Sequence, residues 1–148
     1  LVICANTMHQ YVDRLIEEVK LPIVHIADAT AFEIKKLGLS TIGLLGTKFT
    51  MEMDFYTKRL NDAGIKSLVP EKSERLFIHS TIMDELLKEI FKPESKKKFL
   101  DIINDLEIKG AKGIVLGCTE IPLLIKTFLL HKTFCETQAR VRHSGAGH

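Results

Sequence analysis

The residues Gly113-Ile114-Val115-Leu116-Gly117-Cys118-Thr119-Glu120-Ile121-Pro122 decide the fold that we expect for the chain. A run of consecutive aliphatic residues is typical of a parallel strand buried on both faces, and the glycine after it predicts a turn. This turn brings a thiol, a hydroxyl and a carboxylate together. The first residues, Leu1-Val2-Ile3-Cys4-Ala5-Asn6-Thr7-Met8-His9, repeat the order: an apolar run, a cysteine, then small hydrogen-bonding residues. Two strands that each end in a cysteine are the main indication of a functional site.

The rest of the chain alternates between short apolar runs and amphipathic stretches. Besides residues 1–3 and 113–117, strands are predicted at 23–26, 41–46 and 65–69. Helices are predicted over residues 8–19, 28–37, 51–63, 73–91, 94–109 and 121–130. Asp28 and Thr50 are the expected N-caps of the second and third helices. Strands alternating with helices predict an α/β fold with a parallel sheet flanked by helices.

In such sheets, ligands bind at the carboxyl ends of the strands. Cys4, Thr47 and Cys118 all fall at that edge. Thr47 belongs to Gly43-Leu44-Leu45-Gly46-Thr47-Lys48-Phe49-Thr50, which reads either as a small-anion site or as a tight turn with a threonine cap. This segment lacks the Gly-Lys-Ser/Thr end of a phosphate-binding loop.

The composition is that of a globular protein without a strong charge bias. The 148 residues include 45% hydrophobic and 27% charged residues, with a net charge of +2, and suffice for one ordinary α/β domain. This charge gives no reason to expect nucleic acid as a partner, and no apolar run approaches the roughly 20 residues of a membrane span. Few cysteines, no CxxC pair and no secretory signal indicate a reducing cytoplasm.

Cys118 has several possible roles. On a strand-to-helix turn its thiolate is favoured by nearby backbone N–H groups, but a buried structural cysteine remains an alternative, since free cysteine packs as a small hydrophobic residue. A Cys–His hydrolase could use His9, His25 or His79 as the base, which would leave the second cysteine unexplained. A zinc site would need closer pairs of ligands, and a pyridoxal phosphate site would need a Schiff-base lysine that the sequence does not signal.

Several motifs, in order along the chain, resemble those of the aspartate/glutamate racemase superfamily. They are Cys4-Ala5-Asn6-Thr7-Met8-His9, Pro22-Ile23-Val24-His25-Ile26-Ala27-Asp28-Ala29-Thr30, Gly43-Leu44-Leu45-Gly46-Thr47-Lys48-Phe49-Thr50 and Gly117-Cys118-Thr119-Glu120-Ile121-Pro122. The resemblance covers about residues 1 to 126. The segment after Cys118 is similar to the aspartate racemase branch, whereas the glutamate racemase branch usually has His-Tyr-Pro there.

The resemblance implies a cofactor-independent amino-acid racemase of the aspartate type, without a metal. Cys4 and Cys118 would be the catalytic pair: one thiolate removes the Cα proton from one face, and the other thiol donates a proton to the opposite face. Inversion at a carbon needs an acid and a base on opposite sides, and thiols can be tuned near the operating pH.

The remaining expected site residues would hold the substrate. Those expected to bind the α-carboxylate and stabilise developing charge are Asn6, Thr7, Thr47 and Thr119. Thr50 and Glu120 are weaker candidates, a helix cap and an orienting neighbour. The resemblance further implies a small-molecule amino acid as partner, with aspartate favoured, and a homodimer.

The family's first lobe is represented here by only part of its pattern. The family's opening strand and glycine-rich loop would lie before Leu1, and residues 127–148 do not resemble the strand and helix that normally follow Lys126. We therefore expect a two-lobed fold with an incomplete first lobe at 1–37, a second lobe at 38–126 and a divergent, partly disordered C-terminal helix or tail at 127–148. The alternatives are an inactive truncated chain with a binding or structural role, and a related Cys-dependent enzyme such as a hydantoin racemase, maleate isomerase or decarboxylase.

Overall fold

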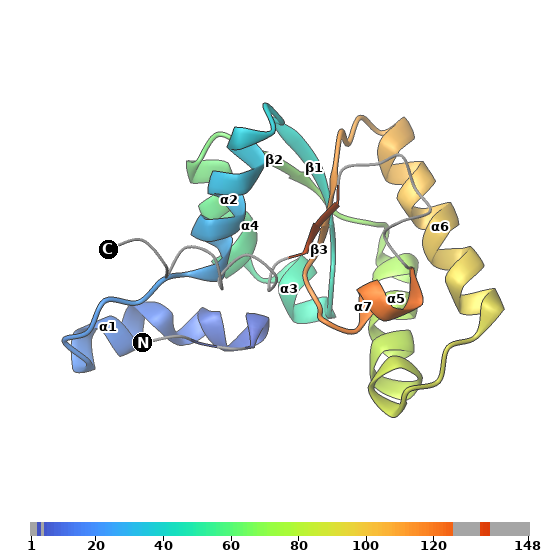
Figure 1. Cartoon of the computed structure of the whole chain (residues 1–148), viewed down its shortest axis with the longest axis horizontal. Helices are drawn as coiled ribbons and strands as arrows, with labels where there is room; N and C mark the ends of the chain where they lie inside the picture. Colours follow the sequence, from blue (N-terminus) through green and yellow to red (C-terminus); the bar gives the residue numbers. More distant parts are fainter. Residues whose placement is uncertain (1–2, 4, 126–133, 137–148) are drawn as a thin grey trace.

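The computed structural model describes residues 3, 5–125 and 134–136, and the statements below concern these residues. Its strands form one parallel sheet in the order β2-β1-β3-β4 (Figure 1). They are β1 (Thr41–Leu45), β2 (Lys66–Leu68), β3 (Ile114–Leu116) and β4 (Phe134–Glu136). Gly43 in the central strand pairs with Leu68 on one side and with Ile114 on the other. The predicted α/β fold with a parallel sheet is confirmed.

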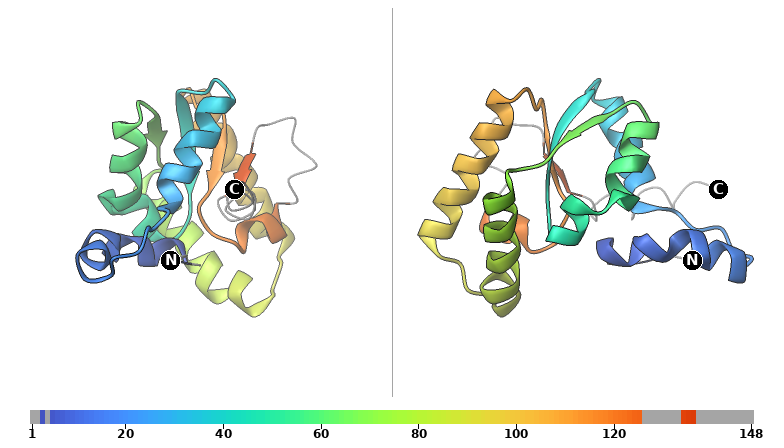
Figure 2. Two further views of the ribbon diagram at one scale, coloured as in Figure 1. Left: turned by 60° about the vertical axis from the view of Figure 1, so that its left-hand side comes forward. Right: turned by 180° about the vertical axis from the view of Figure 1, so that it is seen from behind.

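Helices cover both faces of this sheet (Figures 1 and 2). They are the 3₁₀ helices η1 (Asn6–Tyr11) and η2 (Leu86–Lys88), and the α-helices α1 (Val12–Glu18), α2 (Ile26–Lys36), α3 (Lys48–Glu52), α4 (Asp54–Asp62), α5 (Lys72–Asp84), α6 (Pro93–Ile108) and α7 (Ile121–Leu124). In the described part of the chain, no helix is long and apolar enough to span a membrane.

The core lies in two layers, one on each face of the sheet. Leu44 and Val115 point into a cluster with α2 and α4, whereas Leu45 and Leu116 point into a cluster with α5, α6 and α7. Successive residues of a strand face opposite sides, so a strand covered on both faces needs a continuous apolar run. This explains why β1 and β3 were recognisable from the sequence.

Two predictions about the segment before α2 are wrong. Residues 23–26 do not form a strand, and α2 begins before Asp28. The side chain of His25 caps α2, because its Nδ1 accepts a hydrogen bond from the Ala27 N–H at 3.1 Å. A short apolar run becomes a strand only where a neighbouring strand satisfies its backbone groups, and no described strand lies beside this one. Asp28 binds Arg59 of α4 instead, at 3.0 Å.

The predicted helix over 51–63 is also wrong in detail. It is two helices, α3 and α4, which meet at Met53, where the backbone is extended. Because α3 begins at Lys48, its cap is Thr47 and not Thr50: Thr47 Oγ1 accepts a hydrogen bond from the Thr50 N–H at 3.5 Å. Thr50 lies inside α3 and is fully buried.

The other elements lie close to their predicted positions. η1 and α1 replace the helix predicted at 8–19, α5 and η2 fall at 73–91, and α6 falls at 94–109. α7 begins the helix predicted at 121–130, whose end lies outside the described residues, as do Leu1 and Val2 of the predicted first strand. β4 is a strand that the sequence did not predict, and it extends the parallel sheet beyond β3.

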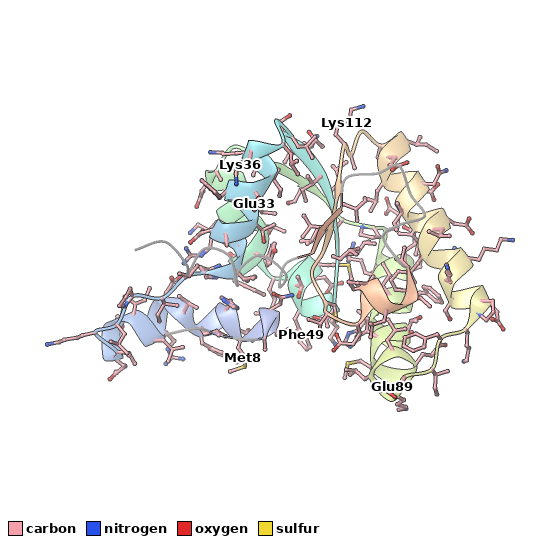
Figure 3. All side chains as sticks on the ribbon, in the orientation of Figure 1. Met8, Glu33, Lys36, Phe49, Glu89 and Lys112 are labelled. Atoms are coloured by element: carbon pink, nitrogen blue, oxygen red, sulfur yellow. The ribbon has the colours of Figure 1, made fainter. Side chains whose placement is uncertain are left out.

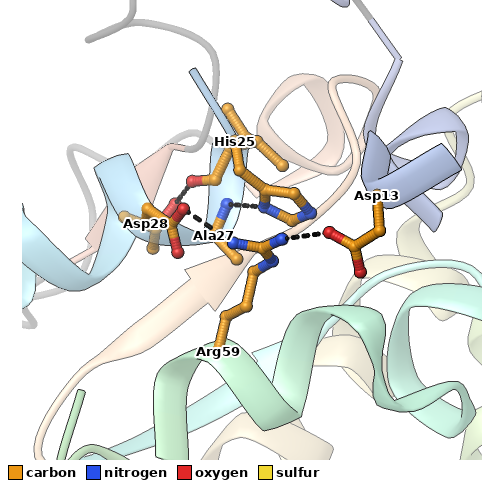
Figure 4. Close-up of polar contacts among 7 residues, drawn as sticks. Asp13, His25, Ala27, Asp28 and Arg59 are labelled. Atoms are coloured by element: carbon orange, nitrogen blue, oxygen red, sulfur yellow. Dashed lines mark hydrogen bonds and ion pairs between the residues drawn. The ribbon is translucent and has the colours of Figure 1, made fainter. Parts of the chain in front are cut away.

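The N-terminal segment is attached to α2 and α4 by polar contacts (Figure 4). Arg59 of α4 binds Asp13 of α1 at 2.8 Å and Asp28 of α2 at 3.0 Å. The buried rings of His9 and His25 meet edge to face with centroids 4.8 Å apart. These contacts fix η1 and α1 at the end of the sheet near α3, the end where β1 and β3 finish.

The division into segments 1–37, 38–126 and 127–148 stays a prediction. The structure adds one relevant contact: Ala31 and Ile34 of α2 pack with Tyr56 and Leu60 of α4 in one core cluster. α2 therefore lies on the same face of the sheet as α4, although the predicted boundary places them in different segments.

Candidate active site

A cavity of about 330 Å³ lies at the carboxyl ends of β1 and β3. Most of the residues predicted for the site line it, although they come from distant parts of the sequence. They are Asn6, Thr7, Thr47, Cys118, Thr119 and Glu120. Cys4 lies outside the described residues, but the two residues that follow it, Ala5 and Asn6, line this cavity. Thr50 lies behind the cavity wall and does not line it.

Asn6 connects the N-terminal segment to the turn after β3. Its Nδ2 donates a hydrogen bond to the Gly117 carbonyl oxygen at 2.7 Å, and both groups are buried. The bond joins residues that are 111 positions apart in the sequence. Asn6 was predicted to bind substrate, and here its amide fixes the backbone next to Cys118.

Thr50 supports the same turn by packing. Gly117 donates a backbone hydrogen bond to the Leu45 carbonyl at 2.6 Å, which draws the ends of β1 and β3 together. A Cβ atom at Gly117 would lie 3.0 Å from both the Leu45 oxygen and the Thr50 methyl group. A side chain at residue 117 would therefore push these neighbours away by a few tenths of an ångström. Thr50 also places its hydroxyl 3.4 Å from that of Thr47, whose side chain does reach the cavity.

Cys118 and Glu120 form a direct pair within this turn. The Cys118 thiol donates a hydrogen bond to Glu120 Oε2 at 2.9 Å. Burial raises the pKa of Cys118 to about 12, and the Glu120 carboxylate adds to this effect. Burial acts to raise the pKa of Glu120 as well, but hydrogen bonds from Cys118 and Thr119 outweigh it, so that the pKa is lowered overall. In the structure the pair is a thiol beside a carboxylate.

One wall of the cavity is apolar and comes from α5 and η2. Its residues are Ile82, Met83 and Leu87. The sequence places Ile82 and Leu87 on the apolar stripe of the helix predicted at 73–91, and helical spacing alone does not separate core positions from the edge of a cavity. The exposure of the side chains separates them: Ile82, which is 1% exposed, belongs to the core behind the wall, whereas Met83 and Leu87, which are 45% and 52% exposed, form its open edge.

The electrostatics of the cavity are simple. Among its described lining residues, Glu120 is the only charged one, and the side-chain hydroxyls of Thr7, Thr47 and Thr119 are neutral donors. In the described residues no group of three or more His, Cys, Asp or Glu side chains is arranged to hold a metal ion. The arrangement offers a thiol proton next to neutral donors that can hold a carboxylate.

The buried histidines belong to another cavity. His9, His25 and Arg59 line a polar cavity of about 360 Å³ that contains none of the predicted site residues. Burial, the charge of Arg59 and the neighbouring His9 lower the pKa of His25 to about 4. Burial lowers the pKa of His9 as well, and neither histidine lines the cavity that contains Cys118.

Comparison with known proteins identifies the family. The Asp/Glu/Hydantoin racemase family matches residues 1–133. The chain belongs to this family. Racemase-family relatives of known structure include an Asp/Glu racemase candidate from Yersinia pestis, with 40% identity and a TM-score of 0.87 over 92% of this chain. An aspartate racemase homologue from Pyrococcus horikoshii has 37% identity and a TM-score of 0.82 over the same share.

Other members of the racemase family match at lower identity. The glutamate racemase of Sulfurihydrogenibium sp. is 29% identical over 129 residues, which are 86% of this chain. This chain spans 48% of that relative and 60% of each of the two structures. The family relationship therefore rests on both sequence and fold, and it concerns about half to three fifths of the length of these racemase-family proteins.

Proposed function

We propose that this chain forms the active-site region of a cofactor-independent amino-acid racemase that uses Cys4 and Cys118 as its acid/base pair. The observation that carries the proposal is the cavity itself. It places the Cys118 thiol beside threonine hydroxyls and beside the residues that directly follow Cys4. Family membership supports an isomerase of amino acids, and this geometry supports the roles of individual residues.

The proposed reaction is a proton exchange at Cα. The thiolate of one cysteine removes the Cα proton from one face of the amino acid, and the thiol of the other donates a proton to the opposite face. Thr7, Thr47 and Thr119 hold the α-carboxylate and stabilise the charge that develops on it as the proton leaves. Asn6 and Thr50 keep the turn before Cys118 in place through Gly117.

Aspartate is the first substrate to test. The sequence Cys118-Thr119-Glu120-Ile121-Pro122 resembles the aspartate racemase branch, and an aspartate racemase homologue is among the similar structures. The described lining has one carboxylate, Glu120, and no cation. The second carboxylate of aspartate would therefore need a cationic partner that lies outside this lining. We further expect a homodimer and a cytoplasmic location.

The test is exchange of the Cα hydrogen in deuterated water, followed by mass spectrometry and chiral chromatography. Aspartate, glutamate, a neutral amino acid, a hydantoin and maleate should be compared. We expect Cys4→Ser and Cys118→Ser each to abolish racemisation, while Cys135→Ser serves as the cysteine control and keeps it. Undiminished racemisation in both single variants would refute the mechanism with two thiols, and turnover of maleate or a hydantoin alone would redirect the substrate class.

A further inference from the structure

The two cysteines of the proposed pair are not equivalent at rest. We infer that Glu120 is a positioning residue that holds Cys118 as a thiol, so that Cys118 is the proton donor in the direction in which Cys4 acts as the base. The reverse reaction passes through the same states with the two roles exchanged. This inference rests on the proposed function, because only that function makes Cys118 a proton donor. The pairing of Cys118 with Glu120 stands on the geometry of the turn alone.

The turn brings the two side chains close enough for a direct contact. Cys118 and Glu120 are two residues apart, and the backbone of Glu120 is already helical because it precedes α7. Its carboxylate thereby folds back to Sγ, with 2.9 Å between Sγ and Oε2. At this distance an ionised carboxylate binds a thiol as hydrogen-bond acceptor and repels a thiolate as a like charge.

The backbone N–H groups of Glu120 and Thr119 favour the thiolate, but burial and the Glu120 carboxylate outweigh them, and no described side chain near Cys118 supplies a positive charge. η1 contributes Asn6 and Thr7 to the cavity, the start of α3 contributes Thr47, and α5 and η2 contribute an apolar wall. None of these side chains is ionisable in the pH range of interest. Among the described groups that face Sγ, the Glu120 carboxylate is the one charge, and it favours the protonated thiol.

The inference also accounts for the return of Cys118 to its starting form. When Cys118 protonates the substrate, its S–H bond breaks and the electron pair of the Cα carbanion forms the new C–H bond. The resulting thiolate then faces the Glu120 carboxylate, and two anions at this distance favour uptake of one proton. Glu120 is partly exposed, so its carboxylate can take that proton from water and pass it to Sγ, while the Cys4 thiol releases to water the proton that it took from Cα.

The test measures the reactivity of Cys118 directly, without substrate. Iodoacetamide alkylates the thiolate: the new S–C bond forms as iodide leaves. Trypsin cleaves after Lys112 and Lys126, which gives a peptide that contains Cys118 and no other cysteine. For the wild type we expect slow alkylation that still rises with pH at about pH 10, where a thiol with an ordinary pKa of about 8.5 has reached its plateau.

Glu120→Gln keeps the size of the side chain and removes its charge. At about pH 8 we expect alkylation of Cys118 to become faster by about tenfold or more, the change that one pKa unit produces. Glu120→Asp keeps the charge and should stay much closer to the wild type. Circular dichroism and the melting temperature of each variant provide the control for folding.

The outcomes separate the two proposals. A wild-type rate that has already reached its plateau at about pH 10 would show an ordinary thiol and overturn the inference, whether or not any variant folds. An unchanged rate in Glu120→Gln would remove Glu120 as the cause. If Cys118 behaves as expected but no amino acid exchanges its Cα hydrogen, the racemase proposal fails and the pairing of thiol and carboxylate stands.

Discussion

Replacing Asn6 by alanine should destabilise the chain, although Asn6 lies at the edge of the fold. Its Nδ2 donates to the Gly117 carbonyl at 2.7 Å, and Asn6 is 9% exposed. The alanine side chain cannot donate, so the Gly117 carbonyl oxygen loses its partner in a place that water reaches poorly. The bond also links η1 to the end of β3, and the variant should loosen η1.

The expected cost follows from the state of the carbonyl group that remains. A hydrogen bond contributes about 0.5–1.5 kcal/mol net, but leaving a buried acceptor unsatisfied costs about 1–3 kcal/mol. We therefore expect Asn6→Ala to lower the free energy of unfolding by about 2 kcal/mol. For a chain of this length that corresponds to a decrease of about 4–8 °C in melting temperature.

Urea unfolding and hydrogen exchange provide the measurements. Thr7→Ala, at the next position of η1 and in the same cavity, is the matched control, and we expect it to cost only about 0.5 kcal/mol. Above the pKa of the carboxyl group, Asn6→Asp replaces the donor by an acceptor of about the same size that repels the Gly117 carbonyl, so it should cost more than alanine there. If Asn6→Ala and Thr7→Ala had equal free energies of unfolding, the proposed link between η1 and β3 would be refuted.

Two further predictions concern stability. Glu89 lies in the turn after η2 (Figure 3) and has a φ of 58°. Glu89→Gly should therefore stabilise the chain by about 1 kcal/mol in urea unfolding, whereas Glu89→Ala should not; an equal gain in both would contradict this reasoning. The pKa of His25 is lowered from 6.5 to about 4 in the folded chain. As the pH falls from about 6.5 to about 4, the unfolded chain therefore binds a proton that the folded chain does not. The free energy of unfolding should decrease over this range by as much as about 3 kcal/mol. His25→Asn keeps an acceptor for the α2 cap, and its urea midpoint should change less between about pH 7 and pH 4.5 than that of the wild type; equal changes would show that another group is responsible.

The sequence predicted the sheet better than the beginnings of the helices. β1 and β3 are buried on both faces, and a run of apolar residues that ends in glycine has few other interpretations in an α/β chain. The N-caps at Asp28 and Thr50 were wrong, because several polar residues near a helix start can serve as the cap. Which one does so depends on where the preceding segment enters the helix, as for His25 and Thr47.

The sequence predicted which residues form the candidate site, but it did not predict the contacts between them. Thr47 and Cys118 line one cavity because the parallel strands β1 and β3 end at the same edge of the sheet, and Asn6 joins them through its bond to Gly117. Their partners could not be read from the motifs. Thr50 faces Gly117 from behind the wall, and the apolar wall of α5 looked like ordinary core.

The sequence by itself determined that Cys118 stands on a turn after a buried strand, with Glu120 two residues later. It also determined that Gly117 precedes it, since local geometry and burial pattern are encoded by neighbouring residues. Only the tertiary structure decided that the Gly117 carbonyl belongs to Asn6, 111 positions away, and that the carboxylate of Glu120 turns toward Sγ. Hydrogen bonds of this kind depend on which elements the fold brings within 3 Å or so of one another, and that distance is set by packing across the whole chain.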